Sequence, residues 1–435
     1  MTQTGFTAEV YQNEFLPAGG RVVDAVVTVS AGGAVTVPAG QQAPAPGEHR
    51  PPSAAQVIIV DTSGSMAYPP TKLANAQKAT GAAIDVLRDG VPFAVVAGDS
   101  MARMVYPIHT GMEPAGAASR AAAKAAVRRL QASGGTAIST WLALAERLFG
   151  MHGAEVNHAI LLTDGQNGEP TSRLRKVLSS CEGKFVCDSR GVGTDWVATE
   201  LREIASALLG SADGLDTPEE LPDVFRRLTE GAMGKQVANV ALRLWTPAGS
   251  TIRFVKQVFP HIEDLTGRRT AVSERIGEYP TGAWGAESRD YHVSIEVEPD
   301  DVGEEVLAAR VALVAGGQPL VERLVLARWT EDTALSTRIS PHVAHYTGQA
   351  ELASAIQEGL AARAAGDEDT ATAKLGTAVR LAAESGREDT AKLLGRVVDV
   401  IDADSGTVRL KRGPDAVDAE IADVRSTVTR RVRGD

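Results

Sequence analysis

The sequence predicts a doubly wound α/β domain that is inserted in an antiparallel β-sandwich and followed by a C-terminal helical region. Between residues 53 and 235, buried-strand patterns alternate with helical patterns, as a doubly wound parallel sheet requires. Strand patterns separated by Gly, Pro and Asp turns occur on both sides of this segment, in residues 5–37 and 236–330. From residue 348 onward, Ala and Leu recur at helical spacing.

The predicted boundaries follow these changes of pattern. Residues 1–52 hold the first sandwich strands and a Pro/Gly linker, and 53–235 form the α/β domain. Residues 236–340 supply the rest of the sandwich, and 341–435 form the helical region. The strands in 5–37 are too few to make a sandwich alone, so they need partners from the later segment. A chain of 435 residues is long enough for about three domains.

Composition excludes several classes of protein. The chain carries 55 acidic and 44 basic residues, a formal net charge of −11, which disfavours broad binding to nucleic acid or anionic membranes. No apolar stretch approaches the ~20 residues of a membrane span. The first residues show no basic region followed by an apolar run, so we expect no secretory signal and a cytoplasmic location.

Within 53–235 the elements can be placed in order. The first strand, Val57–Val60, is followed by a helix with Leu73, Ala76, Ile84 and Leu87 on its core face. Later strands are expected at 93–97, 158–163 and 184–193, with an antiparallel neighbour at 103–106. Helices are expected over 71–88, 119–131, from Ile138 past Leu148, and over 172–180, 196–209 and 218–230.

The flanking regions are predicted more coarsely. Further sandwich strands are expected at 237–244, 251–258, 290–297, 306–314 and 320–329. In the tail, helices are expected at 350–365, 368–385, 388–402 and 415–432, with a turn at 409–413. The basic end Arg430-Arg431-Val432-Arg433 is expected to be a solvated terminus, or else a docking tail for an acidic partner.

The first strand ends at a loop suited to a cation. Asp61-x-Ser63-x-Ser65 puts a carboxylate and two hydroxyls at alternate positions, so they can converge on one point. Gly64 lets the backbone turn between the two serines. Oxygen ligands suit a hard divalent cation. Asp, Ser and Gly are also ordinary turn residues, so the motif by itself is weak.

Two later stretches of the sequence add oxygen-bearing side chains to this loop. Thr136 follows a Gly-Gly pair just before a helix, and Asp164 ends a second buried strand. In a parallel sheet, ligands gather where the carboxyl ends of strands meet helix starts. We therefore expect one cluster of five oxygen-bearing side chains, those of Asp61, Ser63, Ser65, Thr136 and Asp164.

These five residues and the phrases around them resemble the von Willebrand factor A (VWA) family. Its metal-ion-dependent adhesion site (MIDAS) is Asp-x-Ser-x-Ser, then a distant Thr, then a distant Asp, in the order and similar spacing found here. The phrases Val-Asp-Thr-Ser-Gly-Ser-Met, Gly-Gly-Thr-Ala and Leu-Leu-Thr-Asp-Gly also look like the family's. The resemblance covers roughly residues 53–235 and is of the bacterial intracellular type.

The resemblance implies a function in recognition. In the family, the serines and the threonine bind the cation directly, the aspartates bind it directly or through water, and the sixth position takes an acidic group of a partner. It implies Mg²⁺ here, with Mn²⁺ and Ca²⁺ as alternatives. It also implies that ligand capture shifts Asp164 and Thr136 and moves the helix at 218–230.

Comparison with integrin β subunits gives two further expectations. They carry an A-type domain inserted in a sandwich, an architecture that this chain resembles. Integrin β subunits also carry acids after the motif that hold an adjacent calcium. In this sequence those positions are occupied by Ala67, Tyr68, Pro69 and Pro70, so no adjacent site is expected.

Two further stretches, Asp99-Ser100 and 193–196, are expected to rim the same face as the five residues.

Three functional hypotheses remain open. The first is a cytosolic scaffold whose metal site captures a carboxylate of a protein partner, in signalling by a kinase–phosphatase system or in stress response. The second is a substrate adaptor for an AAA+ ATPase of the MoxR or magnesium-chelatase type. The third, a hydrolase using Ser63 or Ser65, lacks a histidine nearby in sequence, so no catalytic residue is assigned. His342-x-x-His345 lacks the Glu of a metalloprotease helix.

The two cysteines, Cys181 and Cys187, are five residues apart. Zinc sites pair cysteines more closely and need two further ligands, which are missing nearby. We therefore expect buried or partly buried free thiols, and a disulfide is disfavoured in a reducing compartment.

Overall fold

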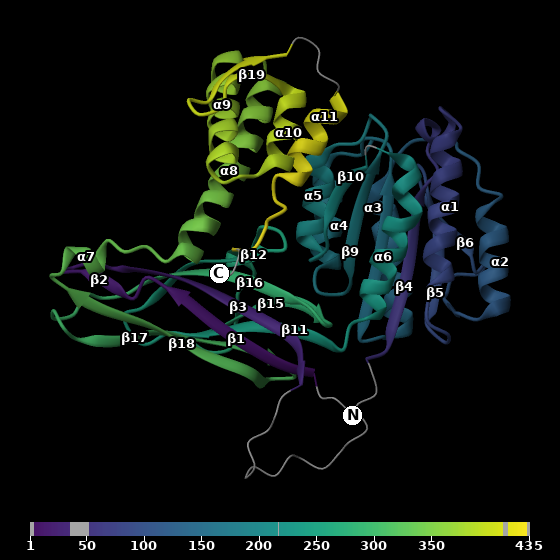
Figure 1. Ribbon diagram of the computed structural model, residues 1–435. Helices are drawn as coiled ribbons and strands as arrows, with labels where there is room; N and C mark the ends of the chain where they lie inside the picture. Colours follow the sequence, from purple (N-terminus) through teal and green to yellow (C-terminus); the bar gives the residue numbers. More distant parts are fainter. Residues whose placement is uncertain (1–3, 35–51, 216, 412–415, 433–435) are drawn as a thin grey trace. The chain divides into compact units, whose positions relative to one another are not determined.

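The computed structural model describes residues 4–34, 52–215, 217–411 and 416–432, and Figure 1 shows its elements. Nearly all of the predicted Pro/Gly linker, at 38–54, lies outside the described residues. The chain separates into two compact units. The first unit consists of Met1–Pro51, Lys235–Glu351 and Thr427–Asp435. The second unit consists of Pro52–Gly234 and Leu352–Ser426.

The second unit contains the predicted doubly wound domain. Its sheet runs in the order β10-β9-β8-β4-β5-β6, with β7 also paired to β5. The strands are parallel except β6 and β7, which are antiparallel to β5. The strands are β4 (Ala54–Asp61), β5 (Pro92–Gly98), β6 (Ala102–Tyr106), β7 (Glu113–Pro114), β8 (Val156–Thr163), β9 (Val186–Val192) and β10 (Ala212–Leu215).

Every residue of β4 is buried, as expected of a central strand with both faces covered. Val57 and Ile59 belong to a core with Trp141, Leu142 and other side chains of α3 and α4. The helix α3 ends at Gly153, whose left-handed conformation, with a φ of +64°, suits a residue without a Cβ. The helices are α1 (Thr71–Asp85), α2 (Ala117–Val127), α3 (Ile138–His152), α4 (Thr171–Cys181), α5 (Ala198–Ala207) and α6 (Leu221–Met233).

The first unit contains two sheets, one in the order β1-β3-β16-β12-β13 and one in the order β14-β15-β11-β17-β18-β2. Their strands pair antiparallel except β2, which is parallel to β18. Strands before and after the α/β domain pair directly, β3 with β16 and β2 with β18, as the inserted arrangement predicts. The longer strands are β1 (Thr4–Gln12), β3 (Val22–Ala34), β11 (Val237–Trp245), β12 (Thr251–Phe259), β15 (Ile276–Trp284), β16 (Ser288–Glu296), β17 (Glu305–Ala315) and β18 (Gln318–Thr330). The short strands are β2 (Phe15–Pro17), β13 (Glu263–Asp264) and β14 (Thr270–Ala271).

The tail is helical, as expected, with one β-hairpin. The helices are α8 (Pro341–Ala364), α9 (Glu368–Glu384), α10 (Glu388–Val397) and α11 (Ala416–Arg425), and a short α7 (Thr333–Ser336) precedes them. The hairpin pairs β19 (Val398–Asp402) with β20 (Thr407–Leu410). None of the described helices is long and apolar enough to cross a lipid bilayer.

The helix α11 docks on the outer edge of the α/β sheet, inside the second unit. Ile421 packs in one apolar cluster with Trp196. Arg425 donates to the Asp213 carboxylate (2.8 Å) and to the carbonyl of Gly214 (2.9 Å), both on the edge strand β10. A segment that is remote in sequence therefore completes this domain.

Several local predictions are wrong. Residues 398–402, expected to be helical, form β19, because Val398, Val400 and Ile401 are β-branched and favour a strand. The first two residues of the expected turn at 409–413 belong to the strand β20. The last helix ends at Arg425 and does not reach 432. The strands β10 and β15 were not expected from the sequence.

The basic end is also not a solvated terminus at Arg431. Its guanidinium lies 2.6 Å from the carboxylate of Asp290, which is 2% exposed, within the first unit. The His342 ring stacks on Tyr11, and His345 bonds to the carbonyl of Arg430, so both histidines have packing roles at the start of α8. Cys181 and Cys187 are free and buried.

Candidate metal centre

The first loop of the site is held by the carboxylate of Asp61, the last residue of β4, which is fully buried. One of its oxygens accepts from the backbone N–H of Ser63 (2.7 Å) and the other from the Thr163 hydroxyl (2.6 Å). Because Thr163 ends β8, this bond ties together the carboxyl ends of two adjacent strands. The side chain of Asp61 is thereby fixed in direction.

The loop that carries Thr136 is joined to the first loop through its backbone. The N–H of Gly64 donates to the carbonyl of Gly134 (2.9 Å), and the N–H of Ser133 donates to the carbonyl of Thr62 (2.7 Å). Gly134 has a φ of +81°, a conformation that favours glycine. The Gly-Gly pair therefore allows the loop to lie against the serines.

Asp164 brings the third loop to the same point. The Ser65 hydroxyl donates to one oxygen of its carboxylate (2.7 Å), and the hydroxyls of Ser63 and Ser65 are 2.9 Å apart. A Cβ added to Gly165 would lie 3.2 Å from the Ser65 hydroxyl oxygen and 3.5 Å from that of Thr136. The glycine after Asp164 thus leaves room for both hydroxyls.

The donor set fits a small divalent cation. In an octahedron with metal–oxygen bonds of about 2.1 Å, adjacent oxygens lie about 3.0 Å apart. The spacings of 2.9 Å between the two serine hydroxyls and 2.7 Å from Ser65 to Asp164 are close to that value. No group of three or more His, Cys, Asp or Glu side chains that could hold a metal was found in the described ranges. This site instead combines two carboxylates with three hydroxyls, a set of oxygen donors that suits a divalent cation.

Lys72 brings a positive charge to the site. Its ammonium lies 2.7 Å from the second oxygen of Asp164, and the residue is only 7% exposed. The site was not expected to contain this lysine, because hydrophobic periodicity marks only the core face of α1. A signal was present, however: Lys72 stands in the first turn of α1, where the helix dipole disfavours a positive charge.

Charge is unbalanced at this end of the sheet. Lys72 pairs with Asp164, whereas the Asp61 carboxylate bonds to Ser63 and Thr163 and pairs with no cation among the described residues. Burial raises the pKa of Asp61, in spite of hydrogen bonds from Ser63 and Thr163, and the Asp164 charge acts in the same direction. A bound cation would relieve both the burial cost and the repulsion.

The two stretches expected to rim the site do lie beside it. The N–H of Gly135 donates to the Ser100 hydroxyl (2.8 Å). Lys72 also lies 3.7 Å from the carboxylate of Asp195, which is 60% exposed. The loops after β5 and β9 therefore border the loops that carry the five residues.

Comparison with known proteins gives consistent results. A family profile for the von Willebrand factor type A domain matches residues 55–213, and one for the von Willebrand factor type A C-terminal domain matches 380–426. The chain is 51% identical to a solved von Willebrand factor type A protein from Catenulispora acidiphila, with a TM-score of 0.91 over 99% of this chain and 98% of that one.

Two further matches are more distant. The ArnB paralog VWA2 from Sulfolobus acidocaldarius shares the fold at 12% identity, with a TM-score of 0.57 over 97% of this chain and 98% of that one. The uncharacterized protein sll0103 of Synechocystis sp. is 30% identical over 233 residues, or 52% of this chain. This match spans about half of that curated relative, 53% of its length.

Proposed function

The chain belongs to the von Willebrand factor type A family of protein-interaction modules, and we propose that it captures a partner protein through a divalent cation held by Asp61, Ser63, Ser65, Thr136 and Asp164. The observation that carries the proposal is the convergence of three loops, with serine and aspartate oxygens 2.7–2.9 Å apart. When bound, the cation would supply an electrophilic position for a carboxylate of the partner.

Each of the site residues has a role in this proposal. Ser63, Ser65 and Thr136 offer neutral oxygens, so the bound cation keeps enough positive charge to attract an anion. Asp61 is held in place by Thr163, and one oxygen of Asp164 is taken by Lys72. Mg²⁺ is the proposed ion, with Mn²⁺ and Ca²⁺ as alternatives, and a cytoplasmic role in signalling or stress response stays a prediction.

The other two hypotheses have less support. The Ser63 and Ser65 hydroxyls bond to one another, and Ser65 also donates to Asp164. In the described part of the chain, neither hydroxyl is hydrogen-bonded to a histidine that could act as a base. An adaptor for an AAA+ ATPase would use the same metal site, so only the identity of the partner separates it from a scaffold.

The test is a pull-down from the native lysate with the full chain as bait. It uses three conditions, Mg²⁺, EDTA, and Mg²⁺ with Asp61→Ala, and mass spectrometry identifies the retained proteins. Asp404→Ala, an exposed aspartate of the same unit, is the matched control. We expect that the wild type and Asp404→Ala retain a set of proteins with Mg²⁺, and that this set is lost with EDTA and with Asp61→Ala. A hexameric ATPase among them would favour the adaptor, and identical sets in all conditions would refute metal-dependent capture.

A further inference from the structure

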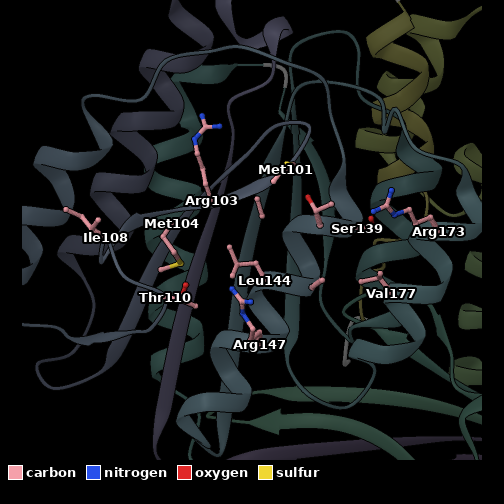
Figure 2. A pocket seen from close by; sticks show the side chains of 13 residues that line it. Met101, Arg103, Met104, Ile108, Thr110, Ser139, Leu144, Arg147, Arg173 and Val177 are labelled. Atoms are coloured by element: carbon pink, nitrogen blue, oxygen red, sulfur yellow. The ribbon is translucent and has the colours of Figure 1, made fainter.

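A groove of about 850 Å³ lies along the edge strand β6 and the helices α3 and α4. Figure 2 shows side chains from these three elements and from the loop after β6 around it. Its lining includes Met101, Arg103, Ile108, Leu144, Arg147 and Arg173.

The charged residues among the lining are all arginines. Arg103 and Arg173 are 49% and 63% exposed, and they pair with Asp99 and Glu169 outside the lining. Arg147 is exposed on α3 and makes no side-chain hydrogen bond or ion pair with any described residue. Asp99 and Glu169 offset the charges of Arg103 and Arg173, so Arg147 supplies the positive charge that a partner can pair with. Such local fields attract anionic partners and hasten their association.

The groove also exposes large apolar side chains. Ile108 is 93% exposed and Met101 is 69% exposed, and both are among the most exposed apolar residues of the described chain. Leu144 and Val177 line the groove from α3 and α4. Covering such side chains with a partner removes apolar surface from water, which favours association. Methionine adapts readily to differently shaped partners.

We propose that this groove binds an acidic protein segment that also carries apolar side chains. An acidic group of the segment pairs with Arg147, and its apolar side chains cover Ile108 and Met101. The alternation of charge and apolar surface fits a peptide better than a nucleic acid, because a phosphate backbone offers no apolar side chains to the methionines and Ile108.

The groove and the metal centre share the same structural elements. Ser139 lines the groove one turn after Thr136, at the start of α3. Asp99, the partner of Arg103, lies against Gly134 in the Thr136 loop. The proposal thus extends the proposed function: the partner that places a carboxylate on the cation would continue along the groove with an acidic, apolar segment.

The test separates groove binding from metal binding. A random library of 12-residue peptides on phage is selected on the immobilised full chain in EDTA. The affinities of enriched peptides are then measured by fluorescence anisotropy for the wild type, Arg147→Glu and Ile108→Ser. The matched controls are Arg128→Glu and Met151→Ser, which change exposed side chains outside the groove.

We expect enriched peptides that combine Asp or Glu with apolar residues. Arg147→Glu should weaken them about tenfold and Ile108→Ser about fivefold, whereas the controls stay within about twofold of the wild type. No enrichment, equal affinity for all variants, or stronger competition by a 20-base-pair DNA duplex than by the peptides would overturn the proposal. Mn²⁺ titration of the same samples reports on the metal centre independently, so either proposal can fail alone.

Discussion

Two buried polar clusters of the same sheet differ in the charges that face their carboxylates. In one, His158 on β8 bonds to Gln56 (2.9 Å) and to Asp188 (2.8 Å). The second oxygen of Asp188 accepts from the backbone N–H of Ser211 (2.8 Å) and from its hydroxyl. Each carboxylate oxygen of Asp188 therefore has a protein donor. In the other cluster, at the carboxyl ends of β4 and β8, two aspartates face one lysine.

The pKa values of the two aspartates move in opposite directions. Burial by itself would raise the pKa of Asp188, but the hydrogen bond and charge of His158, with Arg190 nearby, hold it well below its usual range. Asp61 is also buried, and that burial, together with a smaller effect of the neighbouring Asp164 charge, raises its pKa. Burial alone does not mark a binding site. A negative charge that no nearby cation balances, held among fixed oxygens, does mark a binding site, because a bound cation is then needed to balance it.

The largest expected effect comes from Asp61→Ala. Loss of this carboxylate should weaken Mn²⁺ binding about a thousandfold, which is about 4 kcal/mol, because a charged oxygen and the anchor of Thr163 disappear together. Electron paramagnetic resonance of free Mn²⁺ measures it. Without metal, the variant should be no less stable to urea than the wild type, since a buried, poorly compensated charge has been removed. Retained Mn²⁺ affinity would contradict the assignment of this cluster as the metal centre.

Asp188→Asn should show the opposite pattern. Breaking a satisfied buried network costs about 3 kcal/mol of unfolding free energy, measured in urea, while Mn²⁺ affinity stays unchanged. The pKa of Asp188 is depressed in the folded chain, so its contribution is present above the unfolded value of about 3.9. This contribution to the unfolding free energy declines below about pH 4 and is lost once the pH has fallen through the folded pKa. The difference in unfolding free energy between Asp188→Asn and the wild type should therefore shrink below about pH 4. A fall in Mn²⁺ affinity would show that the two clusters are coupled.

Mg²⁺ should stabilise the chain in proportion to its occupancy. At about 100 times the Kd, binding to the folded state adds about 2.7 kcal/mol to the unfolding free energy. Thermal unfolding of the wild type with Mg²⁺ and with EDTA measures this, and Asp188→Asn should be stabilised equally. Asp61→Ala should show no shift. An equal shift in all three proteins would indicate ion binding elsewhere.

The smallest expected effect belongs to Lys72→Met. Removing the ammonium beside Asp164 frees a carboxylate oxygen and a negative charge for the cation, so Mn²⁺ affinity should rise about tenfold, or about 1.4 kcal/mol. The occupied site should then attract a carboxylate less strongly, because its net charge falls by one. Lys78→Met, an exposed lysine on the same helix, is the control and should behave as the wild type. Weaker Mn²⁺ binding would mean that Lys72 mainly positions Asp164.

The predictability of the molecule differs along the chain for physical reasons. The strands β4, β5 and β8 are continuous apolar runs, so their positions and the acids at their ends are visible in the sequence. The strand β15 contains Gly277, Pro280 and Gly282, which resemble turn residues, and it forms because β11 pairs with it. Lys72 and Thr163 could not be placed, because their partners come from other loops and depend on the tertiary structure.

The contact between α11 and β10 has a practical consequence for dissecting the protein. Production of residues 53–235 alone would remove Ile421 from the cluster around Trp196 and Arg425 from the backbone of Gly214. The fragment would then present an uncovered strand edge beside an apolar surface, a combination that promotes aggregation. A polypeptide designed to carry the metal centre by itself should therefore keep residues 352–426, joined through a new linker.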